Sequence, residues 1–87
     1  MNHSEFNVGL EFHCGGKTYR CTDIGSRVVV AIRIDQVEVA TKHESGEITH
    51  SILSRTEAEA GGWFDGPPYA VMEHVFDEND LDACERT

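Results

Sequence analysis

The chain has 87 residues, of which 39% are hydrophobic, and a formal net charge of −9 at pH 7. A chain of this length buries only about 60–65% of its unfolded surface, so we expect one small domain without a large enclosed active site. Acidic residues outnumber Lys and Arg by 16 to 7, which argues against nucleic acid and anionic membranes as partners, because binding either needs clustered cations.

We expect residues 1–87 to form a single β domain with flexible ends at 1–5 and 83–87. The first residues have neither the basic nor the apolar region of a secretory signal, and the longest apolar run, Val28–Ile32, is far too short to span a membrane. The three cysteines show no C-x-x-C spacing, so no disulfide framework is indicated. A cytoplasmic protein with reduced thiols is therefore predicted.

The stretch FHCGGKTYRC, residues 12–21, allows three interpretations. Its Gly-Lys-Thr is similar to the end of a phosphate-binding loop, but that motif needs an earlier glycine where this chain has Glu11. Its two cysteines and one histidine are potential metal ligands. Its two glycines are typical of a hairpin turn, because glycine reaches positive φ at little cost.

Strand register favours the hairpin. A two-residue turn at Gly15–Gly16 places Phe12 opposite Tyr19 and Glu11 opposite Arg20. One face of the hairpin is then almost entirely apolar, while the other sets opposite charges across from each other. A slip of one residue would spoil both faces, so the two patterns predict the same register.

The same register weakens a metal site built from Cys14, Cys21 and His13. The two cysteines lie about 13 Å apart along the ladder and the histidine points to the other face, whereas zinc needs its ligand atoms about 2.0–2.3 Å from one centre. The remaining histidines and Cys84 show no ligand spacing. We expect no cofactor and no metal, and keep zinc binding or thiol-based redox chemistry through Cys14 and Cys21 as the alternative function.

A third strand is predicted at Val28–Asp35, where alternate residues form an apolar core face made of Val28, Val30, Ile32 and Ile34. Its reverse face, with Val29 and Ala31, is more apolar than a solvated face should be. Beyond it the apolar positions switch from even to odd numbers, which indicates a bulge or bend at Asp35–Gln36. A bend of this kind is how a small sheet curls into a barrel.

An exposed loop at Lys42–Glu47 and a further strand at Ile48–Leu53 follow. Ser54 and Glu57 have the spacing of a capping box, so a short helix is expected to begin there and to end at Gly61–Gly62.

The last predicted strand is Tyr69–Phe76. Both of its faces carry apolar side chains, which is typical of a central strand covered on both sides, or of a strand that a partner covers. The acidic stretch Asp77–Asp82 lacks the glycine and the glutamate that a calcium loop requires. A capped helical turn on a solvated face is predicted there instead.

Short strands, glycine turns, a bent third strand and a final strand with an acidic turn make residues 6–82 similar to the small SH3-like barrels. The resemblance implies a mainly β fold: a small curled antiparallel sheet or SH3-like barrel of about five strands with one or two short helical turns. Such folds serve as peptide-binding, nucleic-acid-binding and assembly domains, so the resemblance does not select a function.

We expect no enzyme, because no nucleophile has an evident base and no catalytic motif is present. Aromatic residues and prolines instead gather between residues 63 and 69. Trp and Tyr combine large contact area with a polar group, and prolines order the backbone before binding. We predict a protein-interaction or regulatory module that binds a protein partner or a second copy of the chain. The predicted binding surface consists of Trp63, Phe64, Pro67, Pro68 and Tyr69, with the acidic turn at Asp77–Asp82 as a candidate rim. Phe64 alone is slightly more typical of a core plug.

Overall fold

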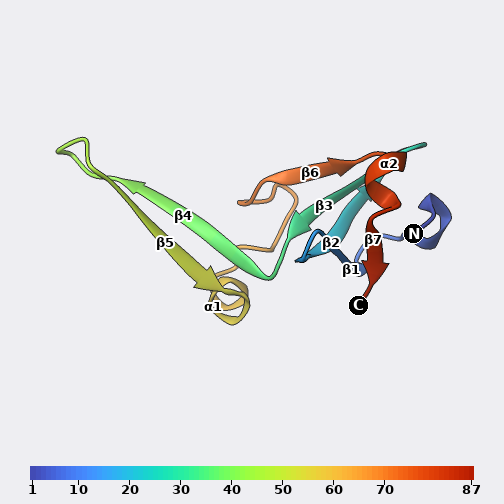
Figure 1. Ribbon diagram of the computed structural model, residues 1–87. Helices are drawn as coiled ribbons and strands as arrows, with labels where there is room; N and C mark the ends of the chain where they lie inside the picture. The colour runs from blue at the N-terminus through green and yellow to red at the C-terminus, as the bar shows by residue number, and fades with distance from the viewer.

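The computed structural model describes residues 1–87 as seven strands, two short α-helices and one 3₁₀ turn at His3–Glu5 (Figure 1). The larger antiparallel sheet has the order β6-β3-β2-β1-β7 and consists of β1 (Glu11–Cys14), β2 (Lys17–Ile24), β3 (Val29–Arg33), β6 (Glu73–Phe76) and β7 (Cys84–Arg86). The smaller sheet pairs β4 (Gln36–Lys42) with β5 (Ile48–Ser54). Helices α1 (Arg55–Ala60) and α2 (Glu78–Leu81) follow β5 and β6. The prediction of a mainly β fold is confirmed.

The β1–β2 hairpin forms in the predicted register. Phe12 lies opposite Tyr19, and Glu11 lies opposite Arg20. Both residues of the Gly15–Gly16 turn have positive φ, at 60° and 78°. Positive φ at both central positions is the type I′ geometry, whose twist matches that of the flanking strands.

The third strand is shorter than predicted, and only half of its predicted core face, Ile32 and Ile34, is fully buried. Val29 and Ala31 are completely buried, whereas Val28 and Val30, which we expected in the core, are only partly buried. The reason is that β3 is covered on both faces. Val29 and Ala31 pack in one hydrophobic cluster, while Ile32 and Ile34, buried as predicted, belong to a second cluster on the other side.

Two hydrophobic clusters therefore make up the core. The first is centred on Phe12, whose ring centroid lies 5.1 Å from that of Phe6, 5.7 Å from Tyr19 and 5.4 Å from Phe76. The second joins the end of β3 to α1 and to the loop after it; its buried members are Ile32, Ile34, Val37, Ala58 and Phe64.

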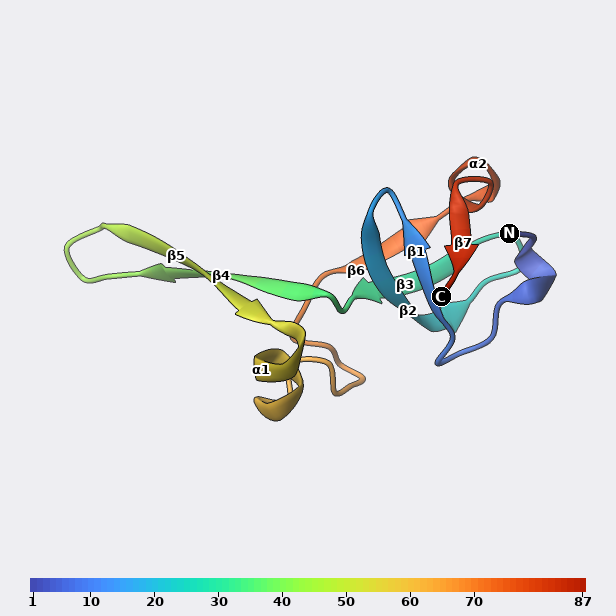
Figure 2. The same cartoon turned by 60° about the horizontal axis from the view of Figure 1, so that its bottom comes forward.

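The predicted bend at Asp35 is confirmed, but it does not curl the sheet into a barrel. The chain leaves the larger sheet there, and β4 pairs only with β5. The resulting ribbon projects from the body of the molecule (Figures 1 and 2). With the ribbon included, the molecule measures 48 Å along its longest axis and 24 Å across. Because β6 and β7 remain the two edges of the larger sheet, the closed SH3-like barrel is not formed.

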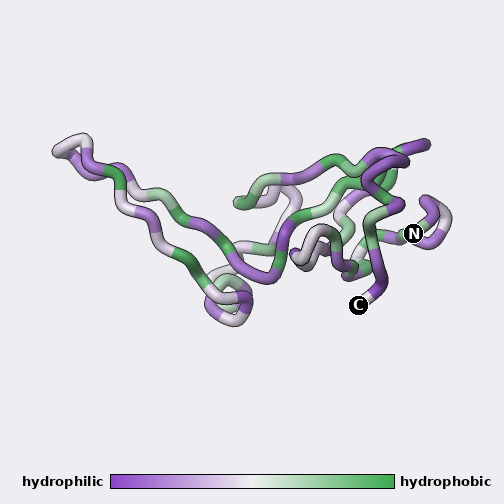
Figure 3. Tube along the Cα trace, viewed as in Figure 1, coloured by the Kyte–Doolittle hydropathy of each residue, from purple (hydrophilic) through white to green (hydrophobic).

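The outer part of the ribbon is solvated on all sides. Every side chain from Ala40 to Ile52 is exposed, and Figure 3 shows apolar and polar residues interspersed along both strands. Only its base packs on the body of the molecule, through Val37, Val39 and Leu53 in the second cluster. A two-stranded ribbon has little stability of its own, so the base anchors it.

The last predicted strand is only half as long as expected. Strand β6 begins at Glu73, and the residues before it, including Tyr69 and Val71, pack on the second cluster outside either sheet. The interpretation of a central strand covered on both sides is wrong, because β6 is an edge strand paired with β3 alone.

Both helices begin at the side-chain caps that the sequence indicates. Ser54 Oγ accepts a hydrogen bond from the Glu57 backbone at 3.2 Å, and Glu57 Oε1 accepts one in return at 3.2 Å. Asp77 Oδ1 accepts hydrogen bonds from the backbone of Asn79 and Asp80. The predicted helix and the capped acidic turn are thus both present. Neither helix is long and apolar enough to cross a lipid bilayer.

The two ends of the chain lie against each other. Strand β7 pairs with β1, and the N-terminal ammonium of Met1 donates to the carbonyl oxygens of Leu81 at 2.8 Å and Cys84 at 3.2 Å. Sequence reasoning missed both contacts. A three-residue strand is too short to show periodicity, and an ammonium–carbonyl contact leaves no pattern in the sequence.

Candidate functional site

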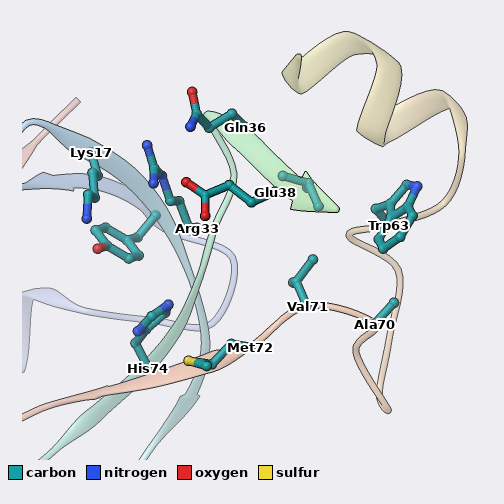
Figure 4. Close-up of a pocket in the computed structure, with 11 residues that line it drawn as sticks. Lys17, Arg33, Gln36, Glu38, Trp63, Ala70, Val71, Met72 and His74 are labelled. Carbon is teal, nitrogen blue, oxygen red and sulfur yellow. The ribbon is translucent and has the colours of Figure 1, made fainter. Parts of the chain in front are cut away.

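A groove of about 370 Å³ opens where the larger sheet, the start of β4 and the loop before β6 meet. Figure 4 shows its labelled side chains converging from these elements. Its lining combines apolar and charged groups: Lys17, Tyr19, Arg33, Gln36, Val37, Glu38, Trp63, Ala70, Val71, Met72 and His74.

The apolar wall of the groove comes from the loop between α1 and β6. Trp63 is partly buried against the second cluster and keeps part of its indole free. Met72 is 73% exposed, which makes it the most exposed large hydrophobic residue of the chain. The groove therefore offers a rigid aromatic surface beside a flexible thioether, which adapts to irregular apolar groups.

The opposite wall is charged. The Arg33 guanidinium binds Asp35 in a bidentate pair, with Nε 2.6 Å from Oδ1 and Nη2 3.1 Å from Oδ2. This hydrogen bonding lowers the pKa of the Asp35 carboxyl and raises the pKa of Arg33. The Glu38 carboxylate also turns toward Arg33 (Figure 4). Lys17 takes part in no ion pair, so its charge is the free cation of the groove.

The floor of the groove contains Tyr19 and His74, whose rings meet edge to face with centroids 5.7 Å apart. Burial raises the pKa of the Tyr19 phenol above its ordinary value, and the neighbouring Cys14 adds to the effect. The phenol therefore stays neutral at physiological pH, when it can donate or accept a hydrogen bond.

Backbone contacts fix the loop that carries Trp63. The backbone N–H of Trp63 donates to the Ala58 carbonyl at 3.0 Å, where α1 ends. The Arg20 side chain on β2 donates to the Phe64 carbonyl. Further along, a side chain at Gly66 would place its Cβ 2.6 Å from the Tyr69 ring, so only glycine fits there. The position of the Trp63 indole is thus set by the end of α1, by the hydrogen bond from Arg20, and by the close approach of the Tyr69 ring to Gly66.

The five residues predicted as a binding surface do not share one environment. Trp63 lines the groove, whereas Phe64 is 4% exposed and lies inside the second cluster. Tyr69 is partly buried against that cluster, and Pro67 and Pro68 are exposed. The structure brings the indole together with other residues instead, from β2, β3 and the chain before β6.

Sequence reasoning missed those other groove residues because they are far apart along the chain. Lys17 follows the hairpin turn and Arg33 ends β3, so only the folded sheet brings them near Trp63. Met72 and His74 could have been found from the sequence, since they alternate along one face of the unusually apolar stretch Tyr69–Phe76.

Three arginines are engaged in contacts within the molecule. Arg20 donates to the Phe64 carbonyl, Arg27 Nε lies 3.1 Å from Glu78 Oε1, and Arg33 is paired with Asp35. Phosphate groups would have to compete with these contacts.

The cysteines are arranged differently from the predicted alternative site. Cys21 lies opposite Ala31 in the β2–β3 ladder, while Cys14 lies opposite Cys84 in the β1–β7 ladder. No three His, Cys, Asp or Glu side chains come close enough to share a metal ion.

No protein-family description, no curated protein and no solved structure matches the chain.

Proposed function

We propose that the protein is a small non-catalytic interaction module that binds an extended segment of a partner protein in the groove beside Trp63. The observation that carries this proposal is the pairing of an accessible apolar wall, Trp63 and Met72, with the free cation of Lys17 on the other side. Interfaces favour buried aromatic anchors of this kind, with charged groups around them.

An extended segment suits this groove because β6 borders it and has a neighbour on one side only. The outer edge of a strand presents unpaired N–H and C=O groups, to which a peptide can add as a further strand. Alternate side chains of that peptide would then point into the groove. Backbone bonding supplies affinity in such complexes, and the pocket supplies specificity.

The groove also indicates the chemistry of the segment. An apolar side chain would pack between Trp63 and Met72, and a neighbouring carboxylate would pair with Lys17. A strongly acidic partner is disfavoured, because the chain as a whole carries a net charge of −9. We therefore propose one acidic residue next to an apolar anchor.

Selection from a random peptide library on the immobilised protein tests the proposal. Enriched peptides should share an apolar–acidic pair, bind the wild type, and lose at least about tenfold in affinity for Trp63→Ala. Lys17→Glu should reverse the charge preference. Val8→Ala is the matched control, because Val8 is exposed and lies outside the groove. Equal binding by wild type and Trp63→Ala would remove the groove from consideration.

Self-association is the second outcome of the same experiment. If sedimentation shows a dimer that Met72→Ser dissociates, the segment in the groove belongs to a second copy of this chain. If the wild type is a monomer and still selects peptides, the partner is another protein.

A further inference from the structure

Cys14 and Cys84 lie directly opposite each other where β1 and β7 pair. The first ends β1 and the second begins β7. Both sulfur atoms lie near the carbonyl oxygen of Asp80, at 4.0 Å from Cys14 Sγ and 3.4 Å from Cys84 Sγ. Two thiols from opposite ends of the sequence thus converge on one point of the fold.

The backbone geometry suits a disulfide. Directly opposed residues of an antiparallel pair have Cα atoms about 4.5 or 5.5 Å apart, and disulfides span Cα separations of about 4.4–6.8 Å. Either spacing allows Cys14 and Cys84 to be joined without moving the strands. The third cysteine, Cys21, has its thiol 3.5 Å from the Asp23 carbonyl and takes no part in this pair.

We propose that Cys14 and Cys84 form a site of reversible oxidative modification, at which a low-molecular-weight disulfide converts the two thiols into a disulfide that joins β1 to β7. The alternative function predicted from the sequence used Cys14 together with Cys21, whereas the fold places Cys84 opposite Cys14.

Cys14 is the thiol that a small disulfide can reach. It is partly exposed and lines a surface hollow of about 360 Å³ at the hairpin turn, beside His13, Gly15, Gly16, Ala83 and Glu85. Cys84 is only 3% exposed. The exposed thiol therefore reacts first and the buried thiol second.

The reaction proceeds in two exchanges. The Cys14 thiolate attacks one sulfur of the small disulfide RSSR, forms a mixed disulfide and releases RS⁻. The Cys84 thiol then loses its proton, attacks Cys14 Sγ, and releases the second RS⁻. Two protein thiols are oxidised to one disulfide, RSSR is reduced to two RSH, and the two protein protons end on the released thiols.

The surroundings of Cys84 support this order. Burial, the hydrogen bond with Cys14 and the charge of the Cys14 thiolate raise the pKa of Cys84 to about 12. The last two causes disappear once Cys14 carries a mixed disulfide. The N-terminal ammonium of Met1, which acts in the opposite direction, stays in place 3.2 Å from the Cys84 carbonyl oxygen. Modification of the first thiol therefore promotes ionisation of the second.

The disulfide would fasten the end of the chain to the sheet. Strand β7 is three residues long and forms an edge, and Met1 is docked on the same segment through Leu81 and Cys84. A covalent bond between residues so distant in sequence restricts the unfolded chain strongly. Oxidation should therefore raise thermal stability, and reduction should restore the original value.

Incubation of the reduced full-length protein with glutathione disulfide tests the proposal, followed by alkylation and digestion without reductant. Trypsin separates Cys14 from Cys21, because Lys17 and Arg20 lie between them. We expect a Cys14–Cys84 cross-linked peptide in the wild type and in Cys21→Ala, reversed by dithiothreitol. The melting temperature of oxidised Cys21→Ala should rise by about 5 °C or more.

Two variants make the test decisive. Cys84→Ser should stop at a glutathione adduct on Cys14, and Cys14→Ser, whose side chain is partly exposed and tolerates the change, should leave Cys84 unmodified in the folded protein. A cross-link through Cys21, a stable adduct on wild-type Cys14, or no reaction at all would overturn the proposal.

Discussion

Arg20 on β2 donates a hydrogen bond from Nη2 to the backbone carbonyl of Phe64, which lies 44 residues later in the chain. A second tie runs in parallel, since Arg55 Nη2 on α1 lies 3.0 Å from Glu11 Oε2 on β1. These two contacts hold α1 and the loop that carries Trp63 on the larger sheet. The groove therefore depends on residues that do not line it.

Arg20→Met should lower the free energy of unfolding by about 1–3 kcal/mol, because it leaves the Phe64 carbonyl without its donor. It should also weaken peptide binding in the groove, since the loop loses its anchor. Arg27→Met is the matched control. Arg27 and its ion-pair partner Glu78 are both exposed, and exposed ion pairs contribute little to the free energy of unfolding. Equal stability of the two variants in urea titrations would contradict this role of Arg20.

Phe64 and Trp63, although adjacent, should respond differently to truncation. Phe64→Ala removes a ring that is 4% exposed and should cost about 3–5 kcal/mol. Trp63→Ala removes a partly exposed ring, so it should cost less stability and mainly abolish peptide binding. Denaturant melts with binding measurements on the same samples separate the two effects. A larger loss of stability for Trp63→Ala than for Phe64→Ala would place the indole in the core.

The sequence predicted local structure well where neighbouring residues decide it. The hairpin register follows from two glycines and two alternating faces, and both helix starts follow from capping residues only three positions apart. The core face of the third strand was predicted correctly at Ile32 and Ile34 but not at Val28 and Val30, because periodicity assumes one buried face. Val29 and Ile32 are both completely buried, on opposite sides of the same strand.

The barrel and the groove could not be predicted for a different reason. Closure depends on whether β4 continues the larger sheet or leaves it, and a bend at Asp35 is compatible with either path. The groove likewise brings together Lys17 and Trp63, whose proximity is a property of the complete fold. Of its residues, only Trp63 belonged to the predicted surface, because local clustering of aromatic residues was the only signal available.

The Gly15–Gly16 turn should tolerate asparagine better than alanine. A Cβ at either position meets no atom within 4 Å, so the cost of substitution comes from the positive φ alone. Gly15→Ala should therefore lower the free energy of unfolding by about 1–2 kcal/mol, and Gly15→Asn by less, because asparagine adopts this conformation more readily. Equal melting temperatures for the two variants would contradict the turn geometry.

Tyr19 should ionise at a higher pH than a free tyrosine. Tyr69→Phe leaves it as the only tyrosine, and its absorbance titration should have a midpoint above 10.0, because burial raises the pKa of the phenol. The pKa of Tyr19 is higher in the folded than in the unfolded protein. The stability associated with the neutral, buried phenol is therefore fully present below about pH 10, and it is lost as the pH rises further and the phenol ionises. A midpoint at or below 10.0 in the folded protein would show that the phenol is solvated.

The outer half of the β4–β5 ribbon should be removable without unfolding the domain. Ala40 and His50 lie opposite each other, so an Asn-Gly turn can replace residues 41–49 and close a shorter hairpin. All the deleted side chains are exposed, and the free energy of unfolding should therefore change by less than about 1 kcal/mol. Val37→Ala is the contrasting variant: Val37 is buried in the second cluster at the ribbon's base, so this change should cost about 1–3 kcal/mol. Amide hydrogen exchange should agree, with fast exchange beyond Ala40 and protection at the base. If the shortened protein unfolds while Val37→Ala stays stable, the ribbon, and not its anchored base, supports the fold.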